Sequence, residues 1–282
     1  MFRSSATHLA DKGVLITGGA HGIGAHVARR IAAVGARVAV LDRDVDAARR
    51  LAAELGSAAA VFEADVTSAE SMAAACSAVA QGFGGIDVVV ANAGIAGPGA
   101  TVAAVDPAAW RNVIDVNLLG VLHTVQAATP YIRQRRGYIV AVASIAAAIP
   151  GPTVSGYVVS KAGVESLMRS VRIELAADGV DVGIAYFGLV DTGLAQQVLT
   201  NSGLSAVMAA LPAAVSKPIP VDAAARAIAA GIERRARRIY APRWVPLLLD
   251  LRPLLFLADR VLARSPRMRR VIRAAEGMEV SA

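Results

Sequence analysis

The chain has 282 residues, of which 55% are hydrophobic and 18% charged, and this composition excludes an intrinsically disordered protein. A single cysteine, Cys76, excludes an internal disulfide framework. The formal net charge of +7 lies entirely in residues 233–282, where 12 arginines face five acidic residues, because the 17 basic and 17 acidic groups of residues 1–232 balance. A basic surface is therefore expected of the C-terminal segment only.

The N-terminal segment and the hydropathy pattern bear on location. Residues 1–13 lack the apolar core of a secretory signal, and no run of about 18 uncharged apolar residues occurs. A lone cysteine also suits a reducing compartment. The sequence therefore predicts a cytoplasmic protein without a membrane-spanning helix.

Short apolar segments alternate with longer, alanine-rich amphipathic segments along the chain. The short segments are mostly apolar throughout, which is typical of parallel strands covered on both faces. Strands are predicted at 13–18, 36–42, 59–65, 86–92, 137–144, 180–187 and 238–241. Helices are predicted at 22–34, 44–55, 68–81, 106–135, 156–177 and 221–235. This order predicts an α/β fold with a Rossmann-type, doubly wound parallel sheet of about seven strands and helices on both faces.

A glycine-rich segment, LITGGAHGIG, joins the first strand to the first helix. Gly18, Gly22 and Gly24 allow a tight turn and let the backbone approach a pyrophosphate at a helix N-terminus. An ordinary βα turn is the alternative. The position between a strand and an amphipathic helix favours nucleotide binding.

The second predicted strand ends in Asp42, 18 residues after Gly24. A carboxylate there can accept hydrogen bonds from the ribose hydroxyls and would repel a 2′-phosphate, so it favours NAD(H) over NADP(H). Two alternatives stay open. The neighbouring Arg43 could turn toward a phosphate, and Asp42 could merely cap the next helix.

The segment SGYVVSKAG places Tyr157 and Lys161 four residues apart, on one face of a predicted helix. A free phenol titrates near pKa 10, and a nearby ammonium together with an oxidised nicotinamide would lower that pKa toward neutral pH. Ser144 ends the preceding strand, where ligand-facing groups gather in open α/β sheets. Alone, a Tyr-x-x-x-Lys pair is more often a surface contact; its order with the other motifs favours a proton-transfer pair.

Taken in order, these motifs resemble those of the short-chain dehydrogenase/reductase family. The resemblance covers residues 12 to about 240 and rests on Thr17 to Gly24, Asp65–Val66, Asn92 to Gly94, Asn117, and Ser144 followed by Tyr157 and Lys161. Two departures are visible. His21 stands at the position of the glycine-rich turn where NADP-preferring members often have a basic residue or serine, and Phe187 precedes Gly188 where the family has proline. The resemblance implies an NAD(P)-dependent oxidoreductase that assembles as a homodimer or homotetramer through the helices carrying Asn117 and Tyr157.

The resemblance also implies a role for each site residue. Tyr157 would be the general acid/base, Lys161 its electrostatic partner, Ser144 the group that orients the substrate, and Asn117 part of a proton relay through a held water. Asp65 and Val66 would flank the adenine. Cofactor binding would fall to Thr17, Gly18, Gly22, Ile23, Gly24, Asp42, Asp65, Val66, Asn92, Ala93, Gly94, Tyr157, Lys161, Gly188, Val190 and Thr192.

In that family the segment 189–220 forms the lid over the substrate, and here it is rich in Leu, Val, Ala and Met. We therefore expect a hydrophobic alcohol or ketone as substrate, with plain core packing as the alternative explanation. We expect residues 1–242 to form the nucleotide-binding domain, including this lid, and residues 243–282 to form a basic, amphipathic extension.

The extension carries an apolar helical stripe that includes Leu254, Leu257 and Val261, with arginines elsewhere around the helix. Pro246 and Pro253 interrupt the apolar run. The favoured interpretation is docking on the chain's own lid or on a neighbouring subunit; contact with an anionic membrane surface is the alternative. Nucleic-acid binding is not expected, since no aromatic platform accompanies the arginines.

No metal site is predicted, because the four histidines and Cys76 show no ligand spacing. The sequence thus predicts an oxidoreductase that transfers hydride between NAD(H) and a hydrophobic secondary alcohol or ketone. Two alternatives remain: an NADPH-dependent reductase of a biosynthetic carbonyl, such as a ketoacyl reductase, and a non-enzymatic nucleotide-binding or membrane-associated protein of the same fold.

Overall fold

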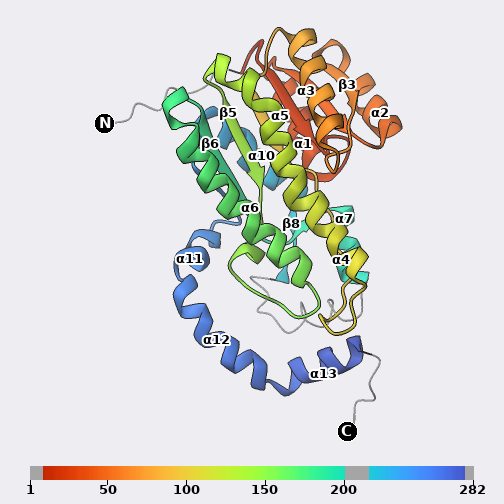
Figure 1. The fold of residues 1–282 in the computed structure, drawn as a ribbon, viewed down its shortest axis with the longest axis vertical. Helices are drawn as coiled ribbons and strands as arrows, with labels where there is room; N and C mark the ends of the chain where they lie inside the picture. Colours follow the sequence, from red (N-terminus) through yellow and green to blue (C-terminus); the bar gives the residue numbers. More distant parts are fainter. Residues whose placement is uncertain (1–8, 201–215, 277–282) are drawn as a thin grey trace.

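The computed structural model describes residues 9–200 and 216–276, and its centre is a seven-stranded sheet in the order β3-β2-β1-β4-β5-β6-β9 (Figure 1). Every neighbouring pair in this sheet is parallel. The strands are β1 (Gly13–Thr17), β2 (Arg37–Asp42), β3 (Ala59–Glu63), β4 (Val88–Ala91), β5 (Tyr138–Val142), β6 (Asp181–Phe187) and β9 (Arg238–Ala241). The chain reverses direction across the sheet between β1 and β4, so the crevice at the carboxyl ends of these strands is where a ligand is expected.

Helices cover both faces of the sheet. One face packs against α1 (Gly22–Ala32), α2 (Val45–Leu55) and α10 (Val221–Glu233). The other packs against α3 (Ala69–Phe83), α5 (Gly120–Arg135) and α6 (Ser155–Glu174). Because side chains alternate across a strand, Leu15 of β1 joins the second layer while Val14 and Ile16 join the first.

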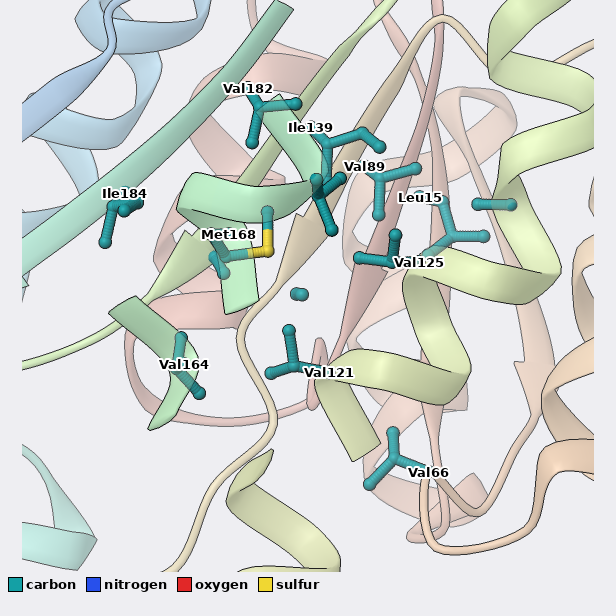
Figure 2. Packing of buried hydrophobic residues seen from close by; sticks show 14 of the residues in the cluster. Leu15, Val66, Val89, Val121, Val125, Ile139, Val164, Met168, Val182 and Ile184 are labelled. Carbon is teal, nitrogen blue, oxygen red and sulfur yellow. The ribbon is translucent and has the colours of Figure 1, made fainter. Parts of the chain in front are cut away.

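The core beneath α5 and α6 is built from branched aliphatic side chains. Figure 2 shows Val121 and Val125 of α5 and Met168 of α6 gathered with Leu15, Val89 and Ile139 of the sheet. All are buried. This packing fixes α6 against β5 and β6, and α6 is the helix that carries Tyr157 and Lys161.

The predicted doubly wound fold is confirmed, and the predicted strands and helices agree with the observed ones to within a few residues. The segment 106–135 differs, because it is not one regular helix. It consists of α4 (Pro107–Ile114), a π-helical turn (Asp115–Leu119) and α5. The wider turn is compensated by hydrogen bonds from the Asn117 side chain, described below.

The predicted lid 189–220 falls partly outside the described residues. Its described parts form α7 (Gly193–Thr200) and a parallel two-stranded ladder of β7 (Val190–Asp191) and β8 (Ile219–Pro220). Short 3-10 turns complete the regular structure at Gly56–Ala58, Ile145–Ala147 and Ala176–Asp178.

After β9 the chain continues in three helices, α11 (Val245–Asp250), α12 (Arg252–Arg264) and α13 (Pro266–Ala275), which form an arc past the lower end of α6 (Figure 1). Val245 and Leu249 are buried and belong to the same hydrophobic cluster as α5 and α6. The predicted helical extension is thus present, and its first helix is part of the core.

Two further contacts hold the extension against the rest of the chain. Arg252 donates a hydrogen bond to Glu165 of α6 at 2.7 Å. Beyond α13, Glu276 accepts a hydrogen bond from the hydroxyl of Thr101 at 2.8 Å. The extension therefore contacts its own chain near both ends, at α6 and at the loop after β4. Docking on the lid or on a neighbouring subunit stays a prediction.

Candidate active site

The glycine-rich turn between β1 and α1 is shaped by contacts that only glycine permits. Gly18 has φ +59°, in the left-handed region that side chains rarely adopt. A Cβ on Gly24 would overlap the carbonyl oxygen of Gly18 and lie 2.8 Å from Nδ2 of Asn92. Nδ2 of Asn92 in turn donates to the carbonyl oxygens of Thr17 and Gly18, at 3.0 Å each. The turn is thereby held against the end of β4.

Thr17, at the end of β1, ties the same two strands together. Its side chain is buried, and Oγ1 accepts hydrogen bonds from the backbone N–H groups of Asn92 at 3.1 Å and Ala93 at 3.3 Å. Thr17 and Asn92 therefore join the carboxyl ends of β1 and β4, with their side chains engaged inside the protein. Ile23, in the first turn of α1, is half-buried.

Asp42 lies at the end of β2 and faces the glycine-rich turn. Its Oδ2 accepts a hydrogen bond from the backbone N–H of Ala20, and its Oδ1 accepts one from that of Asp44, both at 3.0 Å. The cap of α2 is Asp44, which accepts from Ala47. A carboxylate offers about four lone-pair positions. Two remain at Asp42 for hydroxyl donors of a ligand.

Asp65 and Val66 follow β3. The Asp65 carboxylate accepts hydrogen bonds from the backbone N–H and the hydroxyl of Thr67, and these bonds lower its pKa. Val66 is buried, and its carbonyl oxygen accepts a hydrogen bond from Nδ1 of His123 at 2.9 Å. The backbone of this segment is therefore anchored to α5.

The segment after β6 returns to the glycine-rich turn. The backbone N–H of Gly188 donates to Ala241 at 3.0 Å, and Val190 is buried in the small ladder with Ile219. A Cβ on Gly22 would lie 3.5 Å from Cγ2 of Thr192. The fold thus places Thr192 beside the N-terminus of α1.

Lys161 is the buried cation of the site, with 4% of its surface exposed. Its Nζ donates a hydrogen bond to the carbonyl oxygen of Val142 at 2.9 Å and lies 5.6 Å from the centroid of the Tyr157 ring. Burial lowers the pKa of Lys161 to about 8, because the charged ammonium is poorly solvated there. The two side chains expected to act together do lie together.

Tyr157 is half-buried at the start of α6, and burial raises the pKa of its phenol; a hydrogen bond from Ser144 offsets part of that rise. The expected lowering depends on an oxidised nicotinamide as well as on the Lys161 ammonium. Among the protein's own groups desolvation dominates, since the ammonium donates to a backbone carbonyl. Ser144 follows β5 and is buried; its Oγ also accepts from Ala146 at 3.1 Å.

Asn117 is fully buried in the π-helical turn. Its Oδ1 accepts a hydrogen bond from the backbone N–H of Ile95 at 2.8 Å, and its Nδ2 donates to Ile95 O at 2.9 Å and to Ser160 Oγ at 3.1 Å. The amide has one acceptor position left. In the structure, the Asn117 side chain holds the loop after β4 against α6.

Two side chains for which the sequence predicts no role in the site take part in this framework. Ser160 accepts from Asn117 and donates to the carbonyl oxygen of Tyr157 at 2.7 Å. The sequence feature that indicates Ser160 is a small polar residue within the otherwise apolar segment between Tyr157 and Lys161. Trp110 of α4 donates from Nε1 to Ser155 Oγ at 3.1 Å and so joins the helix ahead to α6.

A narrow pocket adjoins Tyr157, between the loop after β4 and the start of α6. Its volume is about 10 Å³, its exposed lining is of mixed polarity, and no charged side chain contributes to it within the described chain. The lining consists of residues 96–100, Val105, Trp110, Val113 and residues 153–157. The wall beside the Tyr157 phenol is therefore uncharged, and it carries hydroxyl groups as well as apolar side chains.

Two searches of the described residues concern metals and membranes. Within 9–200 and 216–276, no group of three or more His, Cys, Asp or Glu side chains is arranged to hold a metal ion. In the same ranges no helix is both long and apolar enough to cross a bilayer. Cys76 is buried, which raises the pKa of its thiol to about 12.

Comparisons with known proteins agree with this geometry. A family model described as short chain dehydrogenase matches residues 12–203. The cis-4-hydroxycyclohexanecarboxylate dehydrogenase of Sinomonas cyclohexanicum is 38% identical over 188 residues, which are 66% of this chain and 76% of the relative. The 11-beta-hydroxysteroid dehydrogenase 1A of Arabidopsis thaliana is 33% identical over 245 residues, covering 84% of this chain and 70% of the relative.

A solved structure shows the same architecture. The 3-ketoacyl-(acyl-carrier-protein) reductase from Brucella melitensis, complexed with NADH, superposes with a TM-score of 0.74 and 28% identity. The alignment covers 83% of this chain and 97% of the other.

Proposed function

The chain belongs to the short-chain dehydrogenase family, and on this premise we propose that it transfers hydride between NAD(H) and a hydrophobic, ring-borne secondary alcohol or its ketone. As a family member it is an NAD(P)-dependent oxidoreductase that acts on CH–OH or carbonyl groups. The observation that carries the proposal is the convergence of Ser144, Tyr157 and Lys161 near the end of β5, beside a pocket to which no charged side chain of the described residues contributes.

In the proposed mechanism Ser144 binds the substrate oxygen and keeps it near the Tyr157 hydroxyl. Tyr157 gives a proton to that oxygen in ketone reduction and takes it back in alcohol oxidation. Lys161 supplies positive charge that favours the phenolate when the proton leaves. A nicotinamide bound in the crevice supplies or accepts the hydride. Asn117 positions the loop that borders both ligands, and the proton relay through it stays a prediction.

The residues of the crevice fit a dinucleotide. The glycine-rich turn leads directly into the N-terminus of α1. The free backbone N–H groups at a helix N-terminus favour binding of a pyrophosphate. We propose that the two free lone-pair positions of Asp42 accept from the adenosine ribose, and that Val66 and Thr192 border the adenine and nicotinamide ends. Ala93, Gly94, Gly188 and Val190 would form the remaining wall.

The preference for NAD(H) is tested by measuring the Kd of NADH and of NADPH for the intact chain and for Asp42→Ala. We expect NADH to bind more tightly to the intact chain and the difference to shrink or reverse in the variant, because repulsion of a 2′-phosphate is removed. Tighter NADPH binding by the unaltered protein would instead favour the NADPH-dependent, ketoacyl-reductase-like alternative. Exposed Arg43 is the side chain positioned to assist it.

The ring-borne substrate is supported by relatives and by the pocket. The two relatives above are named as dehydrogenases of a hydroxycyclohexanecarboxylate and of a hydroxysteroid, which both carry the hydroxyl group on a ring. The lining beside Tyr157 contributes no charged side chain within the described residues, which agrees with an uncharged ring at this position.

Activity on a panel of cyclic alcohols and ketones tests the proposed function as a whole. Tyr157→Phe should reduce kcat/KM by about 10²-fold or more, the range typical of a lost general acid/base. Tyr131→Phe is the matched control. Tyr131 lies near the end of α5, just before β5 begins, whereas the site lies where β5 ends. If the two variants lose activity equally, or if the panel shows no turnover with either cofactor, the proposal fails.

A homo-oligomer is proposed on a separate observation. Val159 and Ile173 on α6 are 48% and 78% exposed, and Leu119 ahead of α5 is 36% exposed. These apolar side chains lie on the helices that pair subunits in the family. We expect light scattering to give a dimer or tetramer, and Ile173→Glu to shift the mass toward the monomer.

We further propose that the outer face of the extension touches anionic lipid. Leu247, Leu254 and Val261 are 65%, 58% and 72% exposed, and Arg260 and Arg264 are exposed beside Val261. Apolar side chains flanked by arginines suit the interface of an anionic bilayer. The full chain should cosediment with phosphatidylserine vesicles more than Arg260→Glu/Arg264→Glu does; equal partitioning would leave a cytoplasmic protein without membrane contact.

A further inference from the structure

The pocket beside Tyr157 contains a buried hydroxyl that the proposed mechanism does not use. Thr153 lies just before α6 and lines the pocket with Trp110 and Tyr157. The residue is 6% exposed, and its Oγ1 has no hydrogen-bond partner among residues 9–200 and 216–276. A hydroxyl buried without a partner costs free energy, so its presence calls for a reason.

The backbone at Thr153 adds a second, independent cost. Its φ is +66°, in the left-handed region. A β-branched side chain is a rare occupant of that region, whereas glycine or asparagine would fit with less strain. Strained residues of this kind cluster at ligand-binding sites. Threonine is therefore unfavourable at this position, both because its backbone conformation is strained and because its hydroxyl has no partner among the described residues.

The other hydroxyls of the pocket are already engaged. Ser155 Oγ accepts from the Trp110 indole at 3.1 Å, and the Tyr157 hydroxyl is hydrogen-bonded to Ser144. The lining contributes no charged side chain within the described residues. A threonine hydroxyl is uncharged; it donates one hydrogen bond and accepts up to two. Its natural ligand is therefore an uncharged oxygen.

We propose that Thr153 binds a second, neutral oxygen of the substrate, a hydroxyl or a carbonyl separate from the one that reacts at Tyr157. The inference rests on the proposed function and narrows its substrate class to cyclic ketones or alcohols that carry another oxygen function. A site built to bond a substrate hydroxyl discriminates strongly against the analogue that lacks it, because its own polar group is then left unpaired. Thr153 is on this account a specificity-determining residue.

The test compares cyclohexanone with cyclohexanones that carry a hydroxyl at ring position 2, 3 or 4. For each ketone, kcat/KM is measured with NADH for the intact chain, Thr153→Val and Thr153→Ser. Valine keeps the shape and the backbone strain and removes only the hydroxyl, whereas serine keeps the hydroxyl. We expect the intact chain and Thr153→Ser to prefer one hydroxylated ketone by about tenfold or more, and Thr153→Val to lose that preference.

The preference is a ratio, so a general loss of activity in a variant does not affect the outcome. An equal ratio in all three proteins, or no preference in the intact chain, overturns the inference while cyclohexanone reduction leaves the proposed function standing. If no ketone is reduced, the proposed function fails, and the inference fails with it. Melting temperature checks the premise separately: Thr153→Val should melt at or above the intact chain, because an unpartnered hydroxyl is gone. A lower melting temperature would reveal an internal partner and overturn the inference even where ketones are reduced.

Discussion

At the scale of single residues, the Lys161 ammonium shows how the fold prepares a cation for chemistry. It lies almost fully inside the protein, and a single backbone carbonyl, that of Val142, accepts a hydrogen bond from it. Burial lowers its pKa to about 8 from 10.5. The folded chain therefore holds this proton less tightly than the unfolded chain, and the stability of the protein depends on pH.

The pH dependence is tested with Lys161→Met. Below pH about 8 both states of the wild type keep the proton, so folding bears the full cost of the buried charge. Between pH 8 and 10.5 the folded state releases the proton first, and stability rises with pH relative to the variant. Urea unfolding across this range should show the difference between wild type and variant changing by about 3 kcal/mol. A difference that does not vary with pH would contradict the buried, neutralisable lysine.

Gly24 permits a second test at the residue scale. An added Cβ would overlap Gly18 O and crowd Nδ2 of Asn92, so Gly24→Ala must open the glycine-rich turn. We expect calorimetry to show loss of NADH binding, with a fall in the free energy of unfolding. The control is Gly82→Ala on α3, where nothing lies within 4 Å of the new Cβ. That change should leave NADH binding intact and stabilise the helix by about 0.5–1 kcal/mol.

Site residues could be predicted from the sequence where the chemistry requires particular residue types at a fixed spacing. The tyrosine–lysine spacing and the glycine-rich turn are local patterns, and both partners of each contact lie within a few residues. Thr153 could not be found that way. Its importance depends on burial and on a left-handed backbone, which arise only when α4 and α6 pack around it. The direction of the Tyr157 pKa likewise depends on burial that sequence spacing does not reveal.

At the scale of elements, the π-helical turn between α4 and α5 is the feature that sequence periodicity misses. A continuous helix was predicted over 106–135, because apolar spacing hardly changes across one wide turn. The turn is stabilised by contacts distant in sequence, from Asn117 to Ile95 and Ser160. Such π turns are frequent at functional sites, and this one fixes the loop that borders the pocket.

The ion pairs of the C-terminal helices give a prediction at this scale. Arg252 and Glu165 pair at 2.7 Å with side chains only 34% and 13% exposed. Arg252→Met leaves the Glu165 carboxylate largely buried without its nearest cation, so we expect a loss of about 1–2 kcal/mol in urea unfolding. Adding Glu165→Gln should recover part of that loss.

The matched control is an exposed pair of the same region. Arg238 and Asp250 lie 2.8 Å apart with side chains 42% and 60% exposed. Asp250→Asn should cost less than about 1 kcal/mol, because water and salt screen this pair. Equal losses for the two pairs would mean that the Arg252 contact does not anchor α12.

At the scale of the whole molecule, the alternation of strands and helices in the sequence predicts the order of the sheet. The sequence pattern does not predict where α11, α12 and α13 pack. The division of the chain at residue 242 was predicted from a change in composition and charge. That change marks where arginines accumulate. It does not mark where the core ends, since Val245 and Leu249 beyond it pack with α5 and α6. The division itself stays a prediction that two shortened chains can decide.

One chain ends after residue 242 and the other after Leu251, which retains α11 but removes α12 and α13. Val245 and Leu249 are 0% and 6% exposed, and burying two such side chains contributes about 3–6 kcal/mol. The shorter chain should therefore melt about 10 °C or more below the full chain, or fail to fold, while the longer one should stay within a few degrees.

If the shorter chain cannot be purified, full-length variants test the same contribution of α11 to stability. Leu249→Ala should cost about 2–5 kcal/mol, because it leaves a cavity beneath α11. Leu247→Ala should cost little, because that side chain is 65% exposed. Equal stability of the two shortened chains, together with a small effect of Leu249→Ala, would place the edge of the folded core at residue 242. The opposite result would make α11 part of the nucleotide-binding domain and leave α12 and α13 as the added segment.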